Sequence, residues 1–249
     1  MKVLDLFSGI GGFSLGLERA GFETVAFCEI EPFCRAVLRK HWPNVPQYDD
    51  VRNLTAERLA ADGIRPDVIC GGFPCQPYSH AGKRMGKEDN RALWPEYRRL
   101  IKECRPSWVI GENVVGFVDL GLDDMLTDLE GLGYSCRPFD IPACAVGANN
   151  ERRREWIIAH AYSDGLKRRI NFKVWGKTQE RPLEILGGIP SKNKRNGIPA
   201  PEFCRKNDGI PGLVDRLKGL GNAVVPQIPE LIGRAILEAE KCKLAESAK

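Results

Sequence analysis

The stretch that decides the fold opens the chain: residues 2–12 read Lys2-Val-Leu-Asp-Leu-Phe-Ser-Gly-Ile-Gly-Gly12. Its first half is an apolar run typical of a buried strand, and its second half is a glycine-rich turn that leads into a helix. Glycines at such a turn allow a tight bend and let a ligand approach the backbone closely. The order of strand, glycine turn and helix predicts an open α/β sheet with a ligand at the end of its first strand.

The rest of the first 160 residues repeats this alternation of short apolar runs and longer amphipathic stretches. We expect strands at 2–7, 23–28, 67–70, 108–111, 134–141 and 155–161. We expect helices at 12–20, 32–40, 55–61, 94–104, 123–132 and, near the end of the chain, 229–242. Thr55 is the expected N-cap of its helix. The alternation predicts a parallel sheet with helices on both faces, a Rossmann-like α/β fold.

The composition is that of a globular protein of 249 residues, of which 43% are hydrophobic and 28% are charged. No window approaches the roughly 18 apolar residues of a membrane span, and the N-terminus lacks a signal-peptide pattern. The nine cysteines are scattered without a Cys-x-x-Cys spacing, and only three histidines accompany them. We therefore expect a cytoplasmic protein without a metal site or membrane association.

Charge is distributed unevenly along the chain, whose net charge is +4. Residues 161–206 carry eleven lysines and arginines against four acids, a surplus of seven positive charges, so the rest of the chain is at −3. Such a block points to a polyanionic partner, although a solvated charged loop would have the same composition. The segment is also rich in glycine and proline. We expect a catalytic domain at 1–160 plus 213–243 and a small irregular region at 161–212.

Two acidic residues follow later strands at positions that suit a nucleotide-like ligand. Glu29 comes about twenty residues after the glycine turn, where an acid can hold a ribose in an open α/β sheet. Asp50 could hold the amino group of an adenine, or it could be a plain loop carboxylate beside Asp49. NAD, FAD and S-adenosylmethionine all fit this pattern.

Two further motifs follow buried strands. The run Gly71-Gly-Phe-Pro-Cys75-Gln-Pro77 places Cys75 at the carboxyl end of a strand, where ligand crevices lie and where facing amides or cations favour a thiolate. The run Gly111-Glu112-Asn-Val114 places Glu112 at the end of the next strand, where burial could keep its carboxyl protonated. Taken alone, each also has a plain interpretation: a buried cysteine in a turn and an acid at a helix start.

Two more motifs complete the set. Glu151-Arg-Arg-Arg154 heads an expected strand, so Arg152 and Arg154 point to the same side. Gly219-Leu-Gly-Asn-Ala-Val-Val-Pro226 precedes the last helix. In order and spacing, the five motifs resemble the Phe-x-Gly-x-Gly, Pro-Cys-Gln, Glu-Asn-Val, Arg-x-Arg and Gly-Asn-Ala-Val motifs of the DNA (cytosine-5) methyltransferase family. Segments within 81–95 look most like the short phage and prophage enzymes of that family.

The resemblance implies an S-adenosylmethionine-dependent enzyme that acts on a cytosine flipped out of the duplex. Cys75 would add to carbon 6 of the cytosine so that carbon 5 takes the methyl group, and Glu112 would bond ring nitrogen 3 and the exocyclic amine. Arg154 would contact the cytosine carbonyl oxygen, and Arg152 would support the loop or a phosphate. The irregular region 161–212 would be the target-recognition part.

By the same resemblance, a further set of residues would surround the cofactor. Glu29 would hold the ribose hydroxyls, Asp50 would hold the adenine amine, and Ile30 would pack on the adenine face or lie in the core. The remaining members of the set are Phe7, Gly9, Ile10, Gly12, Gly72, Trp94, Asn222, Ala223 and Val224.

The resemblance also implies a monomer that binds double-stranded DNA, with a restriction endonuclease as a candidate partner, in a bacterial, archaeal or phage-infected cell. One alternative is a tRNA cytosine-5 methyltransferase, because one branch of the family acts on tRNA with the same motifs. A second is a catalytically impaired DNA-binding relic, suggested by Ala148-Asn-Asn-Glu151, where the family usually carries Pro-Gln or Pro-His. Glu155 also stands where an apolar strand residue is usual. A nicotinamide-dependent oxidoreductase would leave Pro-Cys-Gln and Glu-Asn-Val unexplained.

Overall fold

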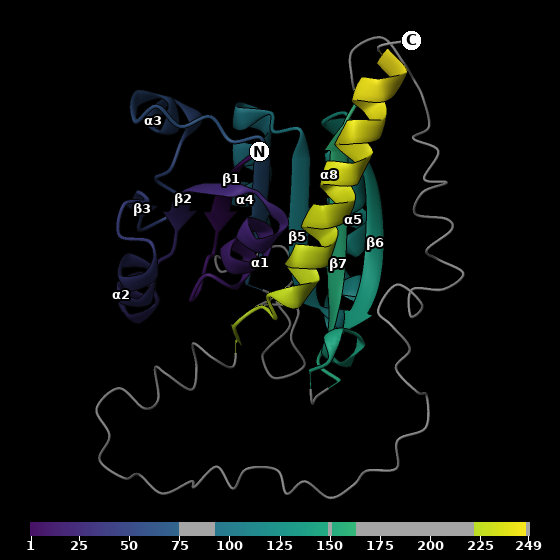
Figure 1. The fold of residues 1–249 in the computed structure, drawn as a ribbon, viewed down its shortest axis with the longest axis horizontal. Coiled ribbons are helices and arrows are strands. Elements are labelled where there is room, and N and C mark those ends of the chain that lie inside the picture. The colour runs from purple at the N-terminus through teal and green to yellow at the C-terminus, as the bar shows by residue number, and fades with distance from the viewer. Residues whose placement is uncertain (75–92, 149–150, 163–221, 248–249) are drawn as a thin grey trace, which may run out of the picture.

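The core of the molecule is a sheet of seven strands in the order β3-β2-β1-β4-β5-β7-β6, with helices on both faces (Figure 1). It is seen in a computed structural model that describes residues 1–74, 93–148, 151–162 and 222–247. The strands are β1 (Lys2–Leu6), β2 (Glu23–Cys28), β3 (Gln47–Tyr48), β4 (Val68–Gly71), β5 (Trp108–Val114), β6 (Tyr134–Pro142) and β7 (Arg153–Ala161). The helices are α1 (Gly12–Ala20), α2 (Pro32–His41), α3 (Ala56–Ala61), α4 (Trp94–Cys104), α5 (Asp123–Gly131) and α8 (Gln227–Ser247).

Most of the expected elements are confirmed close to their expected bounds. The helix α4 spans the expected residues, and Thr55 caps α3 by accepting a hydrogen bond from the backbone N–H of Arg58 at 3.2 Å. The sequence does not predict β3, because Gln47–Tyr48 is too short to show a periodic pattern. The strand β5 runs on to Val114, so Glu112 lies within this strand rather than after it.

The expectation of an all-parallel sheet is wrong for the last two strands. The strands β1 to β5 run parallel, whereas β7 is antiparallel to β5 and β6 is antiparallel to β7. Only residues 143–152 link β6 to β7, and a parallel pair needs a crossover of about a dozen residues or more. Because an apolar strand pattern carries no direction, the short link was the available sign of the reversal.

Apolar side chains hold helices to both faces of the sheet. The helices α3, α4 and α5 contribute to one core cluster, and α1 and α8 contribute to the other. In Figure 1 the yellow α8 crosses in front of β5 and β7, beside α1. A Cβ added to Gly16 of α1 would come within 2.1 Å of the carbonyl oxygen of Pro226, so the start of α8 lies directly on α1. The division into a catalytic domain and a small region stays a prediction, since 163–212 lie outside the described residues.

The topology creates a crevice at one edge of the sheet. The strand β1 lies between β2 and β4, so the chain leaves β1 toward one side and returns to its other side with β4. In open α/β sheets, such a switch point forms a ligand crevice at the carboxyl ends of the strands. Those ends carry the glycine turn after β1, Glu29 after β2, Asp50 after β3 and Glu112 near the end of β5. Among the described residues, no helix is both long and apolar enough to cross a membrane.

Candidate active site

A cavity of about 400 Å³ opens at the carboxyl edge of the sheet, where the ends of β1 to β5 meet the head of β7. This volume lies within the ~300–1,000 Å³ that is usual for small-molecule sites. Ten of the candidate residues line the cavity: Phe7, Gly9, Glu29, Ile30, Asp50, Gly72, Glu112, Arg152, Arg154 and Asn222. The fold therefore gathers residues from all parts of the described chain at one place.

The glycine turn after β1 fixes the carboxylate of Glu29 in the cavity wall. The backbone N–H of Gly9 donates to Oε2 of Glu29 at 2.7 Å, and the N–H of Glu31 donates to Oε1 at 2.7 Å. Phe7, just before the turn, has a φ of 52°, a left-handed conformation that is rare for non-glycine residues and clusters at functional sites. Each oxygen of Glu29 keeps a further lone pair, so the carboxylate can accept hydroxyl groups of a ligand.

Asp50 lies in the turn after β3 and forms a two-pronged ion pair with Arg52. Nη2 of Arg52 lies 2.7 Å from Oδ2 of Asp50, and both the backbone N and Nε of Arg52 lie 2.9 Å from Oδ1. These hydrogen bonds from Arg52 hold the pKa of Asp50 below its ordinary value, so this group is a carboxylate at neutral pH. Both side chains line the cavity, and the carboxylate can accept an amino group there.

Glu112 on β5 and Arg154 on β7 form an ion pair in the cavity, with Nε of Arg154 3.0 Å from Oε1 of Glu112. Burial raises the pKa of Glu112, and the charges of Arg154 and Arg152 offset that rise only in part. The loss of water around the carboxyl thus favours its protonated form. A Cβ on Gly72 would come within 2.6 Å of Oε2 of Glu112, so the residue after β4 passes close to this carboxyl.

The antiparallel direction of β7 brings its arginines to the cavity. Arg154 pairs in register with Val114, the last residue of β5. If β7 ran parallel to β5, its head would lie at the opposite edge of the sheet. Arg152 and Arg154 both line the cavity, which confirms the prediction that they point to the same side. The reversal that the sequence did not predict is therefore what joins the Arg-x-Arg and Glu-Asn-Val motifs.

Asn113 holds the loop that leads to Cys75. Its Nδ2 donates to the carbonyl oxygen of Phe73 at 3.3 Å, and its Oδ1 accepts a hydrogen bond from the backbone N–H of Val114 at 2.9 Å. Pro74 follows in the cavity wall. Cys75, the candidate nucleophile, comes next in the chain and lies outside the described residues.

Five candidate cofactor residues do not line this cavity: Ile10, Gly12, Trp94, Ala223 and Val224. Gly12 serves packing, because a Cβ there would come within 2.5 Å of the carbonyl oxygen of Val224. The ring of Trp94 lies 5.7 Å from that of Phe73, and its Nε1 donates to Asp128 at 2.9 Å. Trp94 thus supports the cavity wall through Phe73.

The cavity also contains residues that were not candidate catalytic or cofactor-binding residues. They are Cys28, Glu31, Phe33, Cys34, Asp49, Val51, Arg52, Phe73, Pro74, Leu93, Asn113 and Val114. Most of them lie close in sequence to a candidate residue, so their place in the cavity could have been predicted from that closeness. Phe33 offered no chemical signal, since an aromatic residue in the first turn of a helix is typical of a core position.

One departure from the family pattern, Glu155, is not among the residues that line the cavity. Glu155 lies in β7, opposite Asn113 on β5 and Asp140 on β6, and it is buried. Burial, followed by the charge of Asp140, raises the pKa of Glu155. The other departure, at Asn149 and Asn150, lies outside the described residues.

Known proteins share this sequence pattern. A family model described as C-5 cytosine-specific DNA methylase matches residues 1–199. The chain is 47% identical over 204 residues to the Type II methyltransferase M.NgoMIV of Neisseria gonorrhoeae, which covers 78% of this chain and 62% of that protein. It is 41% identical over 169 residues to the Type II methyltransferase M.PspPI of a Psychrobacter species, which covers 66% and 40%. The chain spans about half the length of the curated relatives that it matches.

Solved structures share the fold. A crystal structure described as a DNA modification methyltransferase encoded within an E. coli prophage has a TM-score of 0.56 and 30% identity, covering 65% of this chain and 47% of that one. A DNMT2 mutant from Spodoptera frugiperda has a TM-score of 0.56 at 24% identity, covering 68% and 53%, and supports the fold alone. Because the family model covers well over half of its length, the chain belongs to the C-5 cytosine-specific DNA methylase family.

Proposed function

We propose that this chain is an S-adenosylmethionine-dependent DNA methyltransferase that acts on carbon 5 of cytosine. The observation that carries the proposal is the partly buried ion pair of Glu112 and Arg154, which shares its cavity with Pro74, the residue before Cys75. A carboxyl with a raised pKa, an arginine and a thiol supply the proton donor, the anchor and the nucleophile that this reaction needs.

The proposed cofactor site is the part of the cavity formed by the ends of β1, β2 and β3. Glu29 offers acceptor lone pairs to ribose hydroxyls, and Asp50 offers an acceptor to the adenine amino group. Ile30, with 56% of its surface exposed, offers an apolar face to the purine ring. When bound, S-adenosylmethionine supplies the methyl group.

The covalent part of the reaction depends on Cys75. Its thiolate adds to carbon 6 of the cytosine, and carbon 5 becomes electron-rich enough to take the methyl group. Solvent water then takes the proton from carbon 5, and the electron pair of that C–H bond forms the 5,6 double bond as the carbon–sulfur bond breaks, which restores the aromatic ring and the free thiolate. Cys75 is therefore regenerated at the end of each turnover.

Glu112 supports this addition through ring nitrogen 3. Its protonated carboxyl donates to that nitrogen, so negative charge that develops there during thiolate attack is neutralised. Its second oxygen accepts a hydrogen bond from the exocyclic amine. Arg154 holds the carboxyl in place and donates to the cytosine carbonyl oxygen, and Arg152 supports the loop or a phosphate.

DNA is the proposed substrate. A cytosine within a stacked duplex cannot enter a cavity at the edge of a sheet, so the base must be flipped out. The basic residues of 161–206 supply contacts to phosphates, with 161–212 as the target-recognition region. Named relatives are Type II methyltransferases, which favours DNA over tRNA and suggests a restriction endonuclease as a companion of this chain.

A duplex that carries 5-fluorocytosine tests the mechanism, because fluorine cannot leave carbon 5 as a proton does. We expect a covalent protein–DNA complex that survives denaturation and requires S-adenosylmethionine. The variant Cys75→Ser should form none while it binds cofactor unchanged, because a serine hydroxyl is hardly ionised near neutral pH. Turnover of Cys75→Ser at the rate of the unchanged protein would exclude the covalent mechanism.

Bisulfite sequencing of DNA from cells that express the chain tests the substrate. Methylated cytosines in one fixed sequence context would support DNA methylation. Methylation of purified tRNA without any of duplex DNA would support the tRNA enzyme instead. Binding of duplex DNA without adduct or methylation would identify the impaired relic.

A further inference from the structure

The loop that carries Asp50 has almost no regular structure of its own. It runs from β3 to α3, over residues 49–55, and forms one tight turn in which the N–H of Asn53 donates to the carbonyl oxygen of Asp50 at 3.1 Å. Asp50 is the proposed acceptor for the adenine amine, so the position of this loop sets that contact. The loop therefore needs an anchor outside itself.

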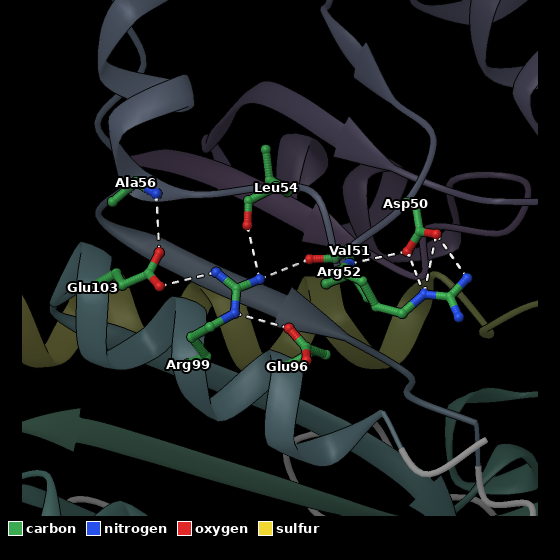
Figure 2. Close-up of polar contacts among 8 residues, drawn as sticks. All are labelled: Asp50, Val51, Arg52, Leu54, Ala56, Glu96, Arg99 and Glu103. Carbon is green, nitrogen blue, oxygen red and sulfur yellow. Dashed lines mark hydrogen bonds and ion pairs between the residues drawn. The ribbon is translucent and has the colours of Figure 1, made fainter. Parts of the chain in front are cut away.

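Arg99 of α4 reaches across to the main chain of this loop (Figure 2). Its Nη2 donates to the carbonyl oxygen of Val51 at 2.9 Å and to that of Leu54 at 2.8 Å. Val51 is the second residue of the turn, one residue after Asp50, and Leu54 directly follows the turn. A single guanidinium nitrogen thus joins the turn and the residue after it to α4.

Two glutamates of the same helix fix the guanidinium of Arg99. Nε of Arg99 lies 2.8 Å from Oε2 of Glu96, and Nη1 lies 2.9 Å from Oε1 of Glu103. Arg99 therefore uses four of the five N–H groups that a guanidinium carries. The other oxygen of Glu103 accepts a hydrogen bond from the backbone N–H of Ala56 at 3.1 Å, which ties the start of α3 to α4 as well.

The side chains of the loop complete its attachment. Val51 and Leu54 are buried at 4% and 1% exposure, in the same core cluster as α4. Between them, the guanidinium of Arg52 donates hydrogen bonds to both carboxylate oxygens of Asp50, as Figure 2 shows. With its neighbours fixed, the carboxylate of Asp50 is held in the cavity wall by Arg52.

Arg99 itself is not among the residues that line the cavity. Any effect of Arg99 on ligand binding is therefore indirect. The hydrogen bonds to Val51 and Leu54 connect Arg99 to the loop that carries Asp50. Lysine cannot replace it, because one ammonium nitrogen cannot reach two carbonyls and two carboxylates in the fork geometry of a guanidinium.

We propose that Arg99, held by Glu96 and Glu103, is a positioning residue for the cofactor site: it places Asp50 and so sets the preference for a 6-amino purine. This inference rests on the proposed function, since it takes the cofactor to be S-adenosylmethionine with its adenine amine on Asp50. Arg99 does not touch the reacting atoms, so it acts on binding rather than on the chemical step.

Calorimetric titration of the full chain tests the proposal with S-adenosylhomocysteine and with its deaminated analogue, which carries a 6-oxo group. In Arg99→Lys we expect the preference for the amino form to fall about tenfold, the effect of losing one hydrogen bond to a charged group. The KM for S-adenosylmethionine should rise in parallel while kcat at saturation stays unchanged. A purely structural role would lower thermal stability without changing the preference between the two ligands.

A matched control lies next to Arg99 on the same helix. Arg98 pairs with Asp128, with Nε 3.3 Å from Oδ1, and is more exposed than Arg99. Arg98→Lys should leave both affinities unchanged. If Arg99→Lys does not fold, Glu103→Gln carries the test, because its amide cannot accept from both Arg99 and Ala56 and should lower the preference about threefold. An unchanged preference in the folded variant would overturn the proposal.

A double-mutant cycle separates this inference from the proposed function. If Arg99 acts through Asp50, adding Arg99→Lys to Asp50→Ala should weaken cofactor binding no further. An equal loss in both backgrounds would overturn the positioning role. If Asp50→Ala alone left the affinity unchanged, the inference would fail, whereas methylation of DNA by the unchanged chain would still support the proposed function.

Discussion

Burial and two arginines act in opposite directions on the carboxyl of Glu112. Burial raises its pKa, and Arg154 and Arg152 lower it. If the protonated form is the active one, methyl transfer slows as the pH rises through this pKa, and the thiolate of Cys75 gives the opposite, acid limb. The pH profile of the chemical step therefore reports the balance between burial and the arginines.

Arg154→Gln should move the alkaline limb of that profile to higher pH. Without the positive charge at 3.0 Å, the ionised form of Glu112 loses its main partner and its pKa rises further. Single-turnover methylation measured across pH checks this shift, and Glu112→Gln should abolish the limb and slow the step ~10²–10⁴-fold. Arg153→Gln is the control, because Arg153 pairs with Asp140 on the neighbouring strand. A limb that stays in place or moves to lower pH would contradict the role of Glu112.

Asp5 is a second buried carboxyl, below the glycine turn. Its Oδ2 accepts hydrogen bonds from Oγ of Ser14 at 2.7 Å and from the Ser14 N–H at 3.3 Å, and no nitrogen or oxygen donor among the described residues reaches Oδ1. Burial raises its pKa to about 7, against an ordinary value of roughly 3.9 in an unfolded chain. Between these values the folded state holds a proton that the unfolded state has lost, so stability falls as pH rises through this window.

Asp5→Asn should flatten that fall, because an amide has no proton to lose. The slope removed is up to about 1.4 kcal/mol per pH unit in the window between the two pKa values. Urea unfolding at a series of pH values from about 4 to 8, which spans the window between the two pKa values, measures this slope. The exposed Asp119→Asn should keep the slope of the unchanged protein. Equal slopes in Asp5→Asn and the unchanged protein would show that Asp5 is ionised throughout.

At the scale of elements, a polar cluster fastens the distal half of α8 to the sheet. Nε1 of Trp108 on β5 donates to Oε1 of Glu240 at 2.9 Å, and Nζ of Lys243 lies 2.8 Å from the same oxygen. His160 on β7 contacts Lys243, and burial, followed by the charge of Lys243, lowers the pKa of His160 to about 4. Because His160 is neutral at neutral pH, the charged partner of the Lys243 ammonium is the carboxylate of Glu240, which also accepts the Trp108 hydrogen bond.

Glu240→Ala should loosen this half of α8, since it leaves the N–H of the buried Trp108 without its acceptor at a cost of about 1–3 kcal/mol. Glu240→Gln keeps an acceptor and should cost less. Hydrogen exchange of α8 amides is the measurement, and exposed Glu238→Ala is the control. Exchange of α8 amides in Glu240→Ala as slow as in the unchanged protein would show that the helix is held by its apolar face alone.

Elements were predictable where their pattern is local. The helix α4 and the cap at Thr55 follow from periodicity and from one side chain, and the strand β1 with the helix α1 after it follows from the glycine turn. The direction of β7 was not predictable from its own residues, because Trp156-Ile-Ile158 has the same apolar pattern in either direction. The short link from β6 hints at it, and the pairing of β7 with β5, in which Arg154 lies opposite Val114, shows it.

The candidate site was predictable to the extent that its motifs carry chemistry. Glu29, Asp50 and Glu112 each follow or end a strand, so a shared edge places them together. Arg99 was not predictable because its partners in the loop are backbone carbonyls, which every residue has and no motif records. Positions such as this one depend on long-range contact, and only a structure reveals them.

At the scale of the whole molecule, the proposed function assigns the binding of DNA to two parts of the chain, the sheet edge and the basic segment 161–206. Acidic side chains outnumber basic ones along the cavity wall, so this wall suits a cofactor and a neutral base better than phosphates. The surplus of seven positive charges in 161–206 is where the chain offers cations to a polyanion. Phosphate contacts made there would hold the duplex while the flipped cytosine enters the cavity.

Neutralising Lys167, Arg168 and Arg169 together to glutamine should therefore weaken DNA binding for all sequences alike. Each phosphate that is deprived of its cation should flatten the dependence of log Kd on log salt by roughly 0.9, measured by titration of labelled duplexes at several salt concentrations. Cofactor affinity should not change, since Glu29 and Asp50 lie at the edge of the sheet. A control that removes the same charge from exposed Arg39, Lys40 and Lys241 should leave the slope intact. Equal slopes in the test variant and the unchanged protein would mean that these cations form a solvated face and that phosphates are held elsewhere.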